Sequence, residues 1–322
     1  MAEINKISLG KTDIDITPIG LGTWQFSEGR YGAMGQWAPI SEELTNEIIQ
    51  TALQGGINWF DTAEIYGGGR SEKALAKGLQ NYGVKNGEVI IATKWFPLFR
   101  WASSIKKTIE RRKAALSPYH IDLYQIHFPA AFSSIEAQAS NLADLIENGE
   151  IKAAGVSNFS ADQMLRAHHV LIKRGFCLAS NQVAYNLLNR KIEVNGILEK
   201  SKELSITIIA YSPLEMGLLT GKFHKDPSLL EKRPFARREK LKRKIKASQE
   251  LINTLEDIAN AHQATVSQVA LNWLISFNAG NVVAIPGASK PSHARESAEA
   301  MNLKLKEDEI EIIDQLSQQF RN

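Results

Sequence analysis

The sequence is poor in the features that mark secreted and membrane-spanning proteins. Its 322 residues include one cysteine, Cys177, so no disulfide forms within the chain, and a chain of this size buries about 75% of its unfolded surface without cross-links. No apolar run approaches the ~18 residues of a membrane-spanning helix. The first residues, MAEINKISLG, contain no apolar core of signal-peptide length. We therefore expect a cytoplasmic protein without a membrane partner.

The sequence also lacks an excess of charge of either sign. Lysine and arginine number 38, aspartate and glutamate 35, and the formal net charge of +3 favours neither nucleic acid nor a membrane surface as a partner. The balance is uneven along the chain, because residues 231–246, EKRPFARREKLKRKIK, hold nine basic and two acidic residues. This basic segment carries +7, so the rest of the chain sums to −4.

No linker rich in proline, glycine or serine, no low-complexity tract and no close repeat divides the chain, so we expect a single domain over residues 1–322. Eight short runs rich in isoleucine and valine alternate with amphipathic stretches, which is typical of buried strands and helices. The predicted strands are 16–22, 57–61, 89–95, 121–127, 151–159, 177–183, 206–212 and 282–287. The predicted helices are 41–54, 103–116, 135–148, 161–173, 196–204, 248–261, 265–278 and 291–301.

This alternation predicts parallel βαβ units and an α/β fold. Eight units in 322 residues favour a closed (β/α)8 TIM barrel over an open doubly wound sheet. Three additions are expected. Residues 4–15 read as a β-hairpin that would plug the bottom of the barrel, residues 213–247 form a long insertion after the seventh strand, and residues 303–322 add a C-terminal helix.

Polar residues close three consecutive predicted strands. Asp61 ends the second strand, whose loop carries Tyr66, and Lys94 and His127 end the third and fourth. Each alone has an ordinary explanation, such as a turn cap, a solvated lysine or a satisfied core histidine. Their joint placement is harder to explain in that way, because barrel enzymes build their active sites at the C-terminal ends of the strands.

These four residues suit the reduction of a carbonyl group. Hydride transfer to a carbonyl requires a proton at its oxygen, and a phenol with a pKa of about 10 is a poor donor at neutral pH. An ammonium beside Tyr66 would lower that pKa, and a carboxylate would hold the ammonium charged. We therefore predict Tyr66 as the acid, Lys94 and Asp61 as its support, and a neutral His127 that orients the carbonyl.

Other catalytic motifs are absent or incomplete. The sequence contains no HExxH, CxxC or GxSxG motif, so we predict no metal and no serine nucleophile. The segment GLGTWQ at 20–25 has two glycines of the dinucleotide fingerprint, but Gln25 replaces the third and no helix follows. A tight turn at the barrel mouth, with Thr23 and Trp24 near the reacting centre, is the preferred interpretation.

Together these segments resemble the aldo-keto reductases. The resemblance rests on GINWFDTAEIYGGGRSEKAL, ATKW, DLYQIH, GVSNFS, NQVAYN, AYSPLEMGLLTGK and LNWLISFNAGNVVAIPGASKP, which occur in the family's order. It is strongest to the branch with DTAxxYG followed by SE, which also contains potassium-channel β subunits. It implies a TIM barrel, binding of NADP(H) without a Rossmann domain, and reduction of small aldehydes or ketones to alcohols. An NADP(H)-sensing regulatory subunit with slow turnover is the alternative.

The resemblance also implies a cofactor site. Ser157, Asn158 and Gln182 would hold the nicotinamide carboxamide, and Tyr211 would stack on its ring. The full predicted set is Gly22, Thr23, Trp24, Asp61, Ser157, Asn158, Gln182, Tyr211, Ser212, Pro213, Leu214, Gly217, Lys222, Arg233, Ile285, Gly287, Ser289, Lys290, His293, Glu296 and Ser297. The chain has Glu296-Ser297 where the family usually has Glu-Asn, and His293 where relatives often have Arg or Gln. The preference for NADP over NAD(H) is therefore left open.

Two further expectations concern the surroundings of this site. Aromatic residues near the strand ends would line the substrate pocket, and they are Trp24, Phe26, Trp95, Trp101 and Phe128. The basic segment is a solvated helix, a nucleic-acid or lipid patch with few aromatics, or a source of positive potential beside the cofactor phosphates. We prefer the last interpretation. The sequence predicts no oligomeric state.

Overall fold

A closed barrel of parallel strands forms the centre of the molecule. The computed structural model describes residues 4–27, 39–231 and 235–322, without the side chains of 235–237 and 240. Within these residues eight parallel strands pair in chain order, from β3 to β10. They are β3 Leu21–Gly22, β4 Trp59–Asp61, β5 Ile90–Trp95, β6 Leu123–Ile126, β7 Ala153–Ser157, β8 Leu178–Ala184, β9 Thr207–Tyr211 and β10 Val282–Ala284. Parallel bridges from Ile19 to Ala284 and from Gly22 to Gly287 join the ends of this order, so the predicted TIM barrel is confirmed.

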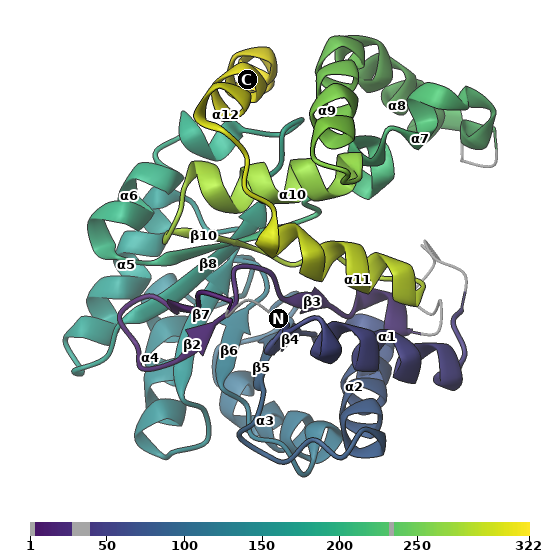
Figure 1. Ribbon diagram of the computed structural model, residues 1–322. Coiled ribbons are helices and arrows are strands. Elements are labelled where there is room, and N and C mark those ends of the chain that lie inside the picture. The colour runs from purple at the N-terminus through teal and green to yellow at the C-terminus, as the bar shows by residue number, and fades with distance from the viewer. Residues whose placement is uncertain (1–3, 28–38, 232–234) are drawn as a thin grey trace.

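Helices surround the strands (Figure 1). Those of the barrel are α1 Glu42–Gln54, α2 Arg70–Asn81, α3 Ser104–Leu116, α4 Ile135–Glu147, α5 Ala161–Ile172, α6 Ile197–Leu204, α9 Gln249–Ala261, α10 Val266–Phe277 and α11 Pro291–Glu299. Side-chain oxygens of Ser41, Ser134, Ser160 and Thr265 cap α1, α4, α5 and α10, as residues of this kind do at helix starts. No helix in the described parts of the chain is long and apolar enough to cross a bilayer.

Helix α2 was not predicted from the sequence. Its N-cap is Gly69, with φ of 90° and no side chain to mark a helix start. Gly78 lies inside the helix, where glycine is normally unfavourable. Packing explains Gly78, because a Cβ there would lie 2.3 Å from Cδ1 of Ile49 on α1. The close contact between the two helices compensates for the poor helix propensity.

The predicted additions to the barrel are present. The insertion after β9 contains α7 Lys222–Lys225 and α8 Phe235–Ala247, which lie with α9 at one side of the ring (Figure 1). The chain ends with α12 Glu307–Ser317. The hairpin consists of β1 Ile7–Ser8 and β2 Asp15–Ile16, paired antiparallel.

The hairpin closes the bottom of the barrel, as predicted. Leu9, Ile14 and Ile16 pack in one apolar cluster with inward-facing strand residues such as Trp59 and Ala179. The other members of this cluster are Ala92, Leu123, Ala153, Ile209, Val283 and Ile285. The amide of Gly10 donates to Oγ1 of Thr207 at 2.8 Å, and a Cβ on Gly10 would lie 2.6 Å from the Ala179 carbonyl oxygen. Only glycine allows this close approach with its φ of 59°.

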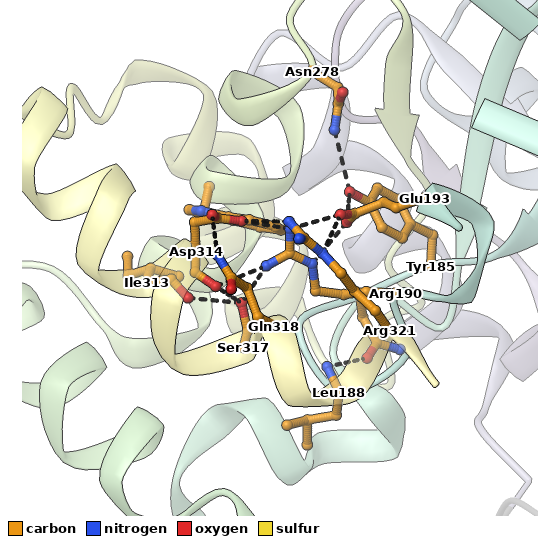
Figure 2. Close-up of polar contacts among 12 residues, drawn as sticks. Tyr185, Leu188, Arg190, Glu193, Asn278, Ile313, Asp314, Ser317, Gln318 and Arg321 are labelled. Carbon is orange, nitrogen blue, oxygen red and sulfur yellow. Dashed lines mark hydrogen bonds and ion pairs between the residues drawn. The ribbon is translucent and has the colours of Figure 1, made fainter. Parts of the chain in front are cut away.

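A buried arginine attaches the C-terminal helix to the barrel (Figure 2). Arg190 is fully buried. Its guanidinium donates to both carboxylate oxygens of Glu193 at 2.7 Å and to Oδ1 of Asp314 on α12 at 2.5 Å. It also stacks over Trp273 and Phe277 of α10, 4.8 and 5.2 Å from the ring centroids. One side chain therefore links the loop after β8 to α10 and α12.

Loss of Arg190 should destabilise the protein. Arg190→Met leaves the buried Glu193 and the partly buried Asp314 with only Arg321 as an arginine partner. We expect it to lower the free energy of unfolding by about 3 kcal/mol, measured by urea denaturation. Lys77→Met is the control, because Lys77 and Glu42 form an ion pair with more than half of each side chain exposed, and its loss should cost less than about 1 kcal/mol. Equal effects of the two substitutions would contradict this account.

Candidate active site

A cavity of about 670 Å³ lies at the C-terminal ends of the strands. It is lined by strand-end residues such as Gly22, Asp61, Ser157, Gln182 and Tyr211 and by the loops that follow them. Its volume is within the range of small-molecule sites. The cavity brings together most residues of the predicted cofactor set: Gly22, Thr23, Trp24, Asp61, Ser157, Asn158, Gln182, Tyr211, Ser212, Pro213, Leu214, Gly217, Lys222, Ile285, Gly287, Ser289, Lys290, His293, Glu296 and Ser297. Arg233 lies outside the described residues.

Lys94 and Asp61 form a buried ion pair beneath the cavity. The two side chains are 0% and 1% exposed. The Lys94 ammonium donates to both Asp61 oxygens at 2.6 and 2.5 Å and to the Thr62 carbonyl at 2.8 Å. The Tyr66 hydroxyl lies 3.5 Å from the same nitrogen, and Tyr66 itself lines the cavity. The three predicted residues therefore meet, with the phenol on the cavity side.

Burial and charge act in opposite directions on this pair. Loss of water raises the pKa of Asp61 and lowers the pKa of Lys94, and their mutual attraction opposes both shifts. Gln182 supports the carboxylate, because its amide nitrogen donates to Asp61 Oδ1 at 2.9 Å. Lys94 keeps a full set of acceptors in this arrangement, two from Asp61 and one from Thr62.

His127 is also buried at the cavity. Its ring stacks on Phe128, with centroids 4.6 Å apart and planes at 7°, and it meets the edge of Tyr66 at 5.9 Å. Burial, and secondarily the nearby Lys94, hold the pKa of His127 well below 6.5. The imidazole is therefore neutral at neutral pH, as the predicted orienting role requires.

A second set of hydrogen-bonded polar side chains, centred on Asn158, forms part of the cavity wall. The side-chain oxygen of Asn158, Oδ1, accepts from the Tyr211 hydroxyl at 2.9 Å, and its side-chain nitrogen, Nδ2, donates to Ser157 Oγ at 3.0 Å. Asn158 has φ of 61°, a strained conformation that often marks a functional position. Ser157 Oγ in turn donates to the Gln182 carbonyl at 2.9 Å. The side-chain amides of Asn158 and Gln182 are the kind of group that offers both donor and acceptor atoms to a carboxamide ligand.

The far end of the cavity is basic. Lys290 is the N-cap of α11, where the helix dipole favours anions. Lys222, Ser289 and His293 also line this end. Burial lowers the pKa of His293, and the positive charges of Lys290 and Lys222 lower it further, so these groups share one region of positive potential.

One residue of the basic segment is tied to the cavity. Lys244 on α8 contacts Glu215 Oε1 at 2.5 Å, and Asn186 donates to Glu215 Oε2 at 2.8 Å. Glu215 lies between Leu214 and Met216, which both line the cavity. This contact places Lys244 beside the cavity.

The predicted substrate aromatics divide into two groups. Trp24 and Phe128 line the cavity. The structure places Phe26, Trp95 and Trp101 away from its lining. Phe26 is 2% exposed within the core shared by strands and helices, and Trp101 is 63% exposed beside Phe132.

Trp95 lies outside the barrel interior because side chains alternate along a strand. Its neighbour Lys94 faces inward to Asp61, so Trp95 faces the helices and donates from its indole nitrogen to Ser104 Oγ of α3 at 3.1 Å. The alternation was available in the sequence as a signal that Lys94 and Trp95 cannot share one face.

Several residues of the cavity had no prediction. These are Gln25, Met216, Thr220, Thr265, Ser267 and Pro286. A Cβ on Gly287 would lie 2.3 Å from the Gln25 amide nitrogen, so that glycine makes room for Gln25. Thr265 caps α10 together with Gln268, and this capping box was the available signal for a helix start near the site.

The chain is similar to known oxidoreductases over most of its length. The family model described as Aldo/keto reductase family matches residues 18–318. A chloroplastic pyridoxal reductase of Arabidopsis thaliana is 33% identical over 94% of this chain and 83% of its own length. The aldo-keto reductase YhdN of Bacillus subtilis is 34% identical over 88% of this chain and 85% of its own. The solved structure of a glycerol dehydrogenase from Gluconobacter oxydans is 28% identical, with a TM-score of 0.80 over 100% of this chain and 98% of that one.

The depressed pKa of His127 predicts a loss of stability in acid. Below about pH 6.5 the unfolded histidine takes up a proton that the folded one does not, so the free energy of unfolding falls as pH falls. We expect His127→Gln to lose less stability than the wild type between about pH 7.5 and about pH 5 in urea denaturation. Other histidines contribute to both proteins alike, so identical slopes would contradict the burial of a neutral His127.

Proposed function

Because the chain belongs to the Aldo/keto reductase family and is an oxidoreductase, we propose that it reduces small aldehydes or ketones to alcohols with NADPH. The observation that carries the proposal is the position of the Tyr66 hydroxyl, 3.5 Å from a buried ammonium and open to the cavity. The adjoining amides, the Tyr211 ring and the basic far end fit the carboxamide, nicotinamide and phosphates of an extended dinucleotide.

The bound cofactor would supply the hydride to the carbonyl carbon, and the protein would supply the proton. Tyr66 donates its hydroxyl proton to the carbonyl oxygen, and the resulting phenolate is stabilised by the Lys94 ammonium. Asp61 holds that ammonium charged and in place through its two short contacts. The neutral His127 hydrogen-bonds the same carbonyl oxygen and orients it.

The pocket wall favours flat substrates. Trp24 and Phe128 flank the Tyr66 and His127 rings, with centroids 6.2 Å from Tyr66 and 4.6 Å from His127 respectively. Aromatic faces of this kind stack on planar rings. Since one relative is named a pyridoxal reductase, we include pyridoxal with 4-nitrobenzaldehyde, glyoxals and sugars in the substrate panel. Rapid multiple turnover of any of these supports the enzyme, whereas a single slow turnover with retained NADP would identify a sensing subunit.

Removal of the phenol proton should slow reduction strongly and leave binding intact. We expect Tyr66→Phe to lower kcat by about 10²–10⁴-fold, while the Kd for NADPH from fluorescence titration stays within about twofold, because the binding contacts lie elsewhere in the cavity. Tyr82→Phe is the matched control, because Tyr82 is 43% exposed at the end of α2. A Tyr66→Phe protein with wild-type turnover would show that another group is the acid.

The basic end of the cavity should distinguish NADPH from NADH. We expect Lys290→Met to raise the Kd for NADPH by about tenfold, since a charge-assisted hydrogen bond to the extra phosphate is lost, and to leave the Kd for NADH nearly unchanged. Fluorescence titrations of both cofactors measure this, with the exposed Lys304 changed to Met as the control. Equal weakening of both cofactors would refute a phosphate contact by Lys290.

A further inference from the structure

Behind the Tyr66 segment lies a second buried set of charges. Glu72, Glu64 and Arg112 are 0%, 6% and 8% exposed. They come from α2, the loop after β4, and α3. Among the described residues, none of the three lines the cavity. Burying charges is costly, and ion pairs of this kind often add little to stability compared with apolar side chains, so their role here calls for an explanation.

The Glu64 carboxylate joins the Tyr66 loop to the next strand and helix. Glu64 lies two residues before Tyr66. Its Oε2 accepts from the Arg112 guanidinium at 2.6 Å. Its Oε1 accepts from the Phe96 amide at 2.8 Å and from Arg100 at 2.5 Å. The loop that carries Tyr66 is thus held to the segment that follows Lys94.

The Glu72 carboxylate holds the other end of the same segment. Its Oε1 accepts from Thr93 Oγ1 at 2.7 Å, and its Oε2 pairs with Nε of Arg112 at 2.9 Å. Thr93 immediately precedes Lys94 on β5 and faces the opposite side of the strand. Arg112 therefore bridges two carboxylates, and these anchor both flanks of Tyr66 to the strand of Lys94.

Tyr66 needs such anchors because its own turn is built from glycine. Gly67, Gly68 and Gly69 follow it with φ of 63°, 67° and 90°, and glycine gives the backbone little intrinsic rigidity. The contact between the phenol and the ammonium is long, at 3.5 Å. A displacement of about 1 Å in such a site can cost about 10²-fold in rate.

We propose that Arg112, through Glu64 and Glu72, is a positioning residue that fixes Tyr66 against Lys94. This inference rests on the proposed function, because Tyr66 is taken as the proton donor. The cluster acts from outside the barrel, while the reacting groups face the cavity. Its loss should slow proton delivery and leave cofactor and substrate binding nearly unchanged.

The cluster also has an electrostatic property that links it to pH. Burial raises the pKa of Glu72 to about 7, with Arg112 and Lys94 opposing and Glu64 adding to the rise. Tyr124 on β6 also interacts with Glu72. Protonation near neutral pH removes one of the two carboxylate charges that hold Arg112. The positioning therefore weakens as pH falls through about 7.

The first experiment compares two buried arginines. Arg112→Met should lower the single-turnover rate of NADPH oxidation by about 10–100-fold, with KM and the Kd for NADPH within about twofold. Arg190→Met removes an arginine that is likewise buried between two carboxylates (Figure 2), and it should keep the wild-type rate although it is destabilised. Wild-type rates in Arg112→Met, or equal losses in both variants, would overturn the inference.

A second variant answers the case in which Arg112→Met does not fold. Glu72→Gln keeps the shape of the side chain and an oxygen that can accept from Thr93, but it removes the charge and places an amide NH2 in place of the oxygen that pairs with Arg112. We expect a lowered rate that no longer changes with pH around about 7, whereas the wild-type rate falls below that pH. A Glu72→Gln protein with the wild-type rate and pH profile would overturn the proposal.

A structural measurement separates this inference from the proposed function. If the wild type turns over no carbonyl compound, the proposed function fails. Crystal structures of the wild type and of Glu72→Gln still test the positioning. The inference requires the distance from the Tyr66 hydroxyl to Lys94 Nζ to lengthen in the variant, and an unchanged distance overturns it.

Discussion

The ion pair between Lys94 and Asp61 is the constraint around which the upper half of the barrel is arranged. Two charges without solvent contact are tolerated only if each finds partners. The structure provides them from three strand ends, because Asp61 also receives the Gln182 amide and Lys94 also donates to the Thr62 carbonyl. The closed sheet brings these groups together, since side chains of the neighbouring strands β4 and β5 meet that of Gln182 on β8 across the barrel interior.

The two ends of the barrel differ in how their interior is filled. At the bottom the hairpin fills the interior with apolar side chains such as Leu9 and Ile16, packed against Trp59. At the top the interior is left open, and strand ends and loops line a cavity of about 670 Å³ that contains polar groups such as Asp61 and Asn158. The stability of the apolar end allows the other end to keep buried charges and strained residues, such as Asn158 with φ of 61°.

Strand β5 connects the site to its support, because its two faces carry different chemistry. Lys94 points into the barrel, and Thr93 and Trp95 point to the helices. The outward threonine contacts Glu72, which contacts Arg112. A displacement of Glu72 or Arg112 in the helix layer can therefore move Lys94 inside the barrel, because Thr93 and Lys94 are neighbours on β5.

The sequence by itself determined the order of strands and helices and the residue types at the strand ends. Periodicity, capping residues and local motifs are properties of neighbouring residues, so the eight strands and the group of Asp61, Tyr66, Lys94 and His127 were predictable. Helix α2 was not predicted, because Gly69 at its N-cap has no capping side chain and Gly78 inside it is explained only by packing against Ile49. Only the tertiary structure decided that Phe26 lies in the core, and that Arg112 pairs with Glu64, 48 residues away. Such choices depend on which face of a strand meets the barrel interior and on contacts between distant segments, and local sequence does not encode either directly.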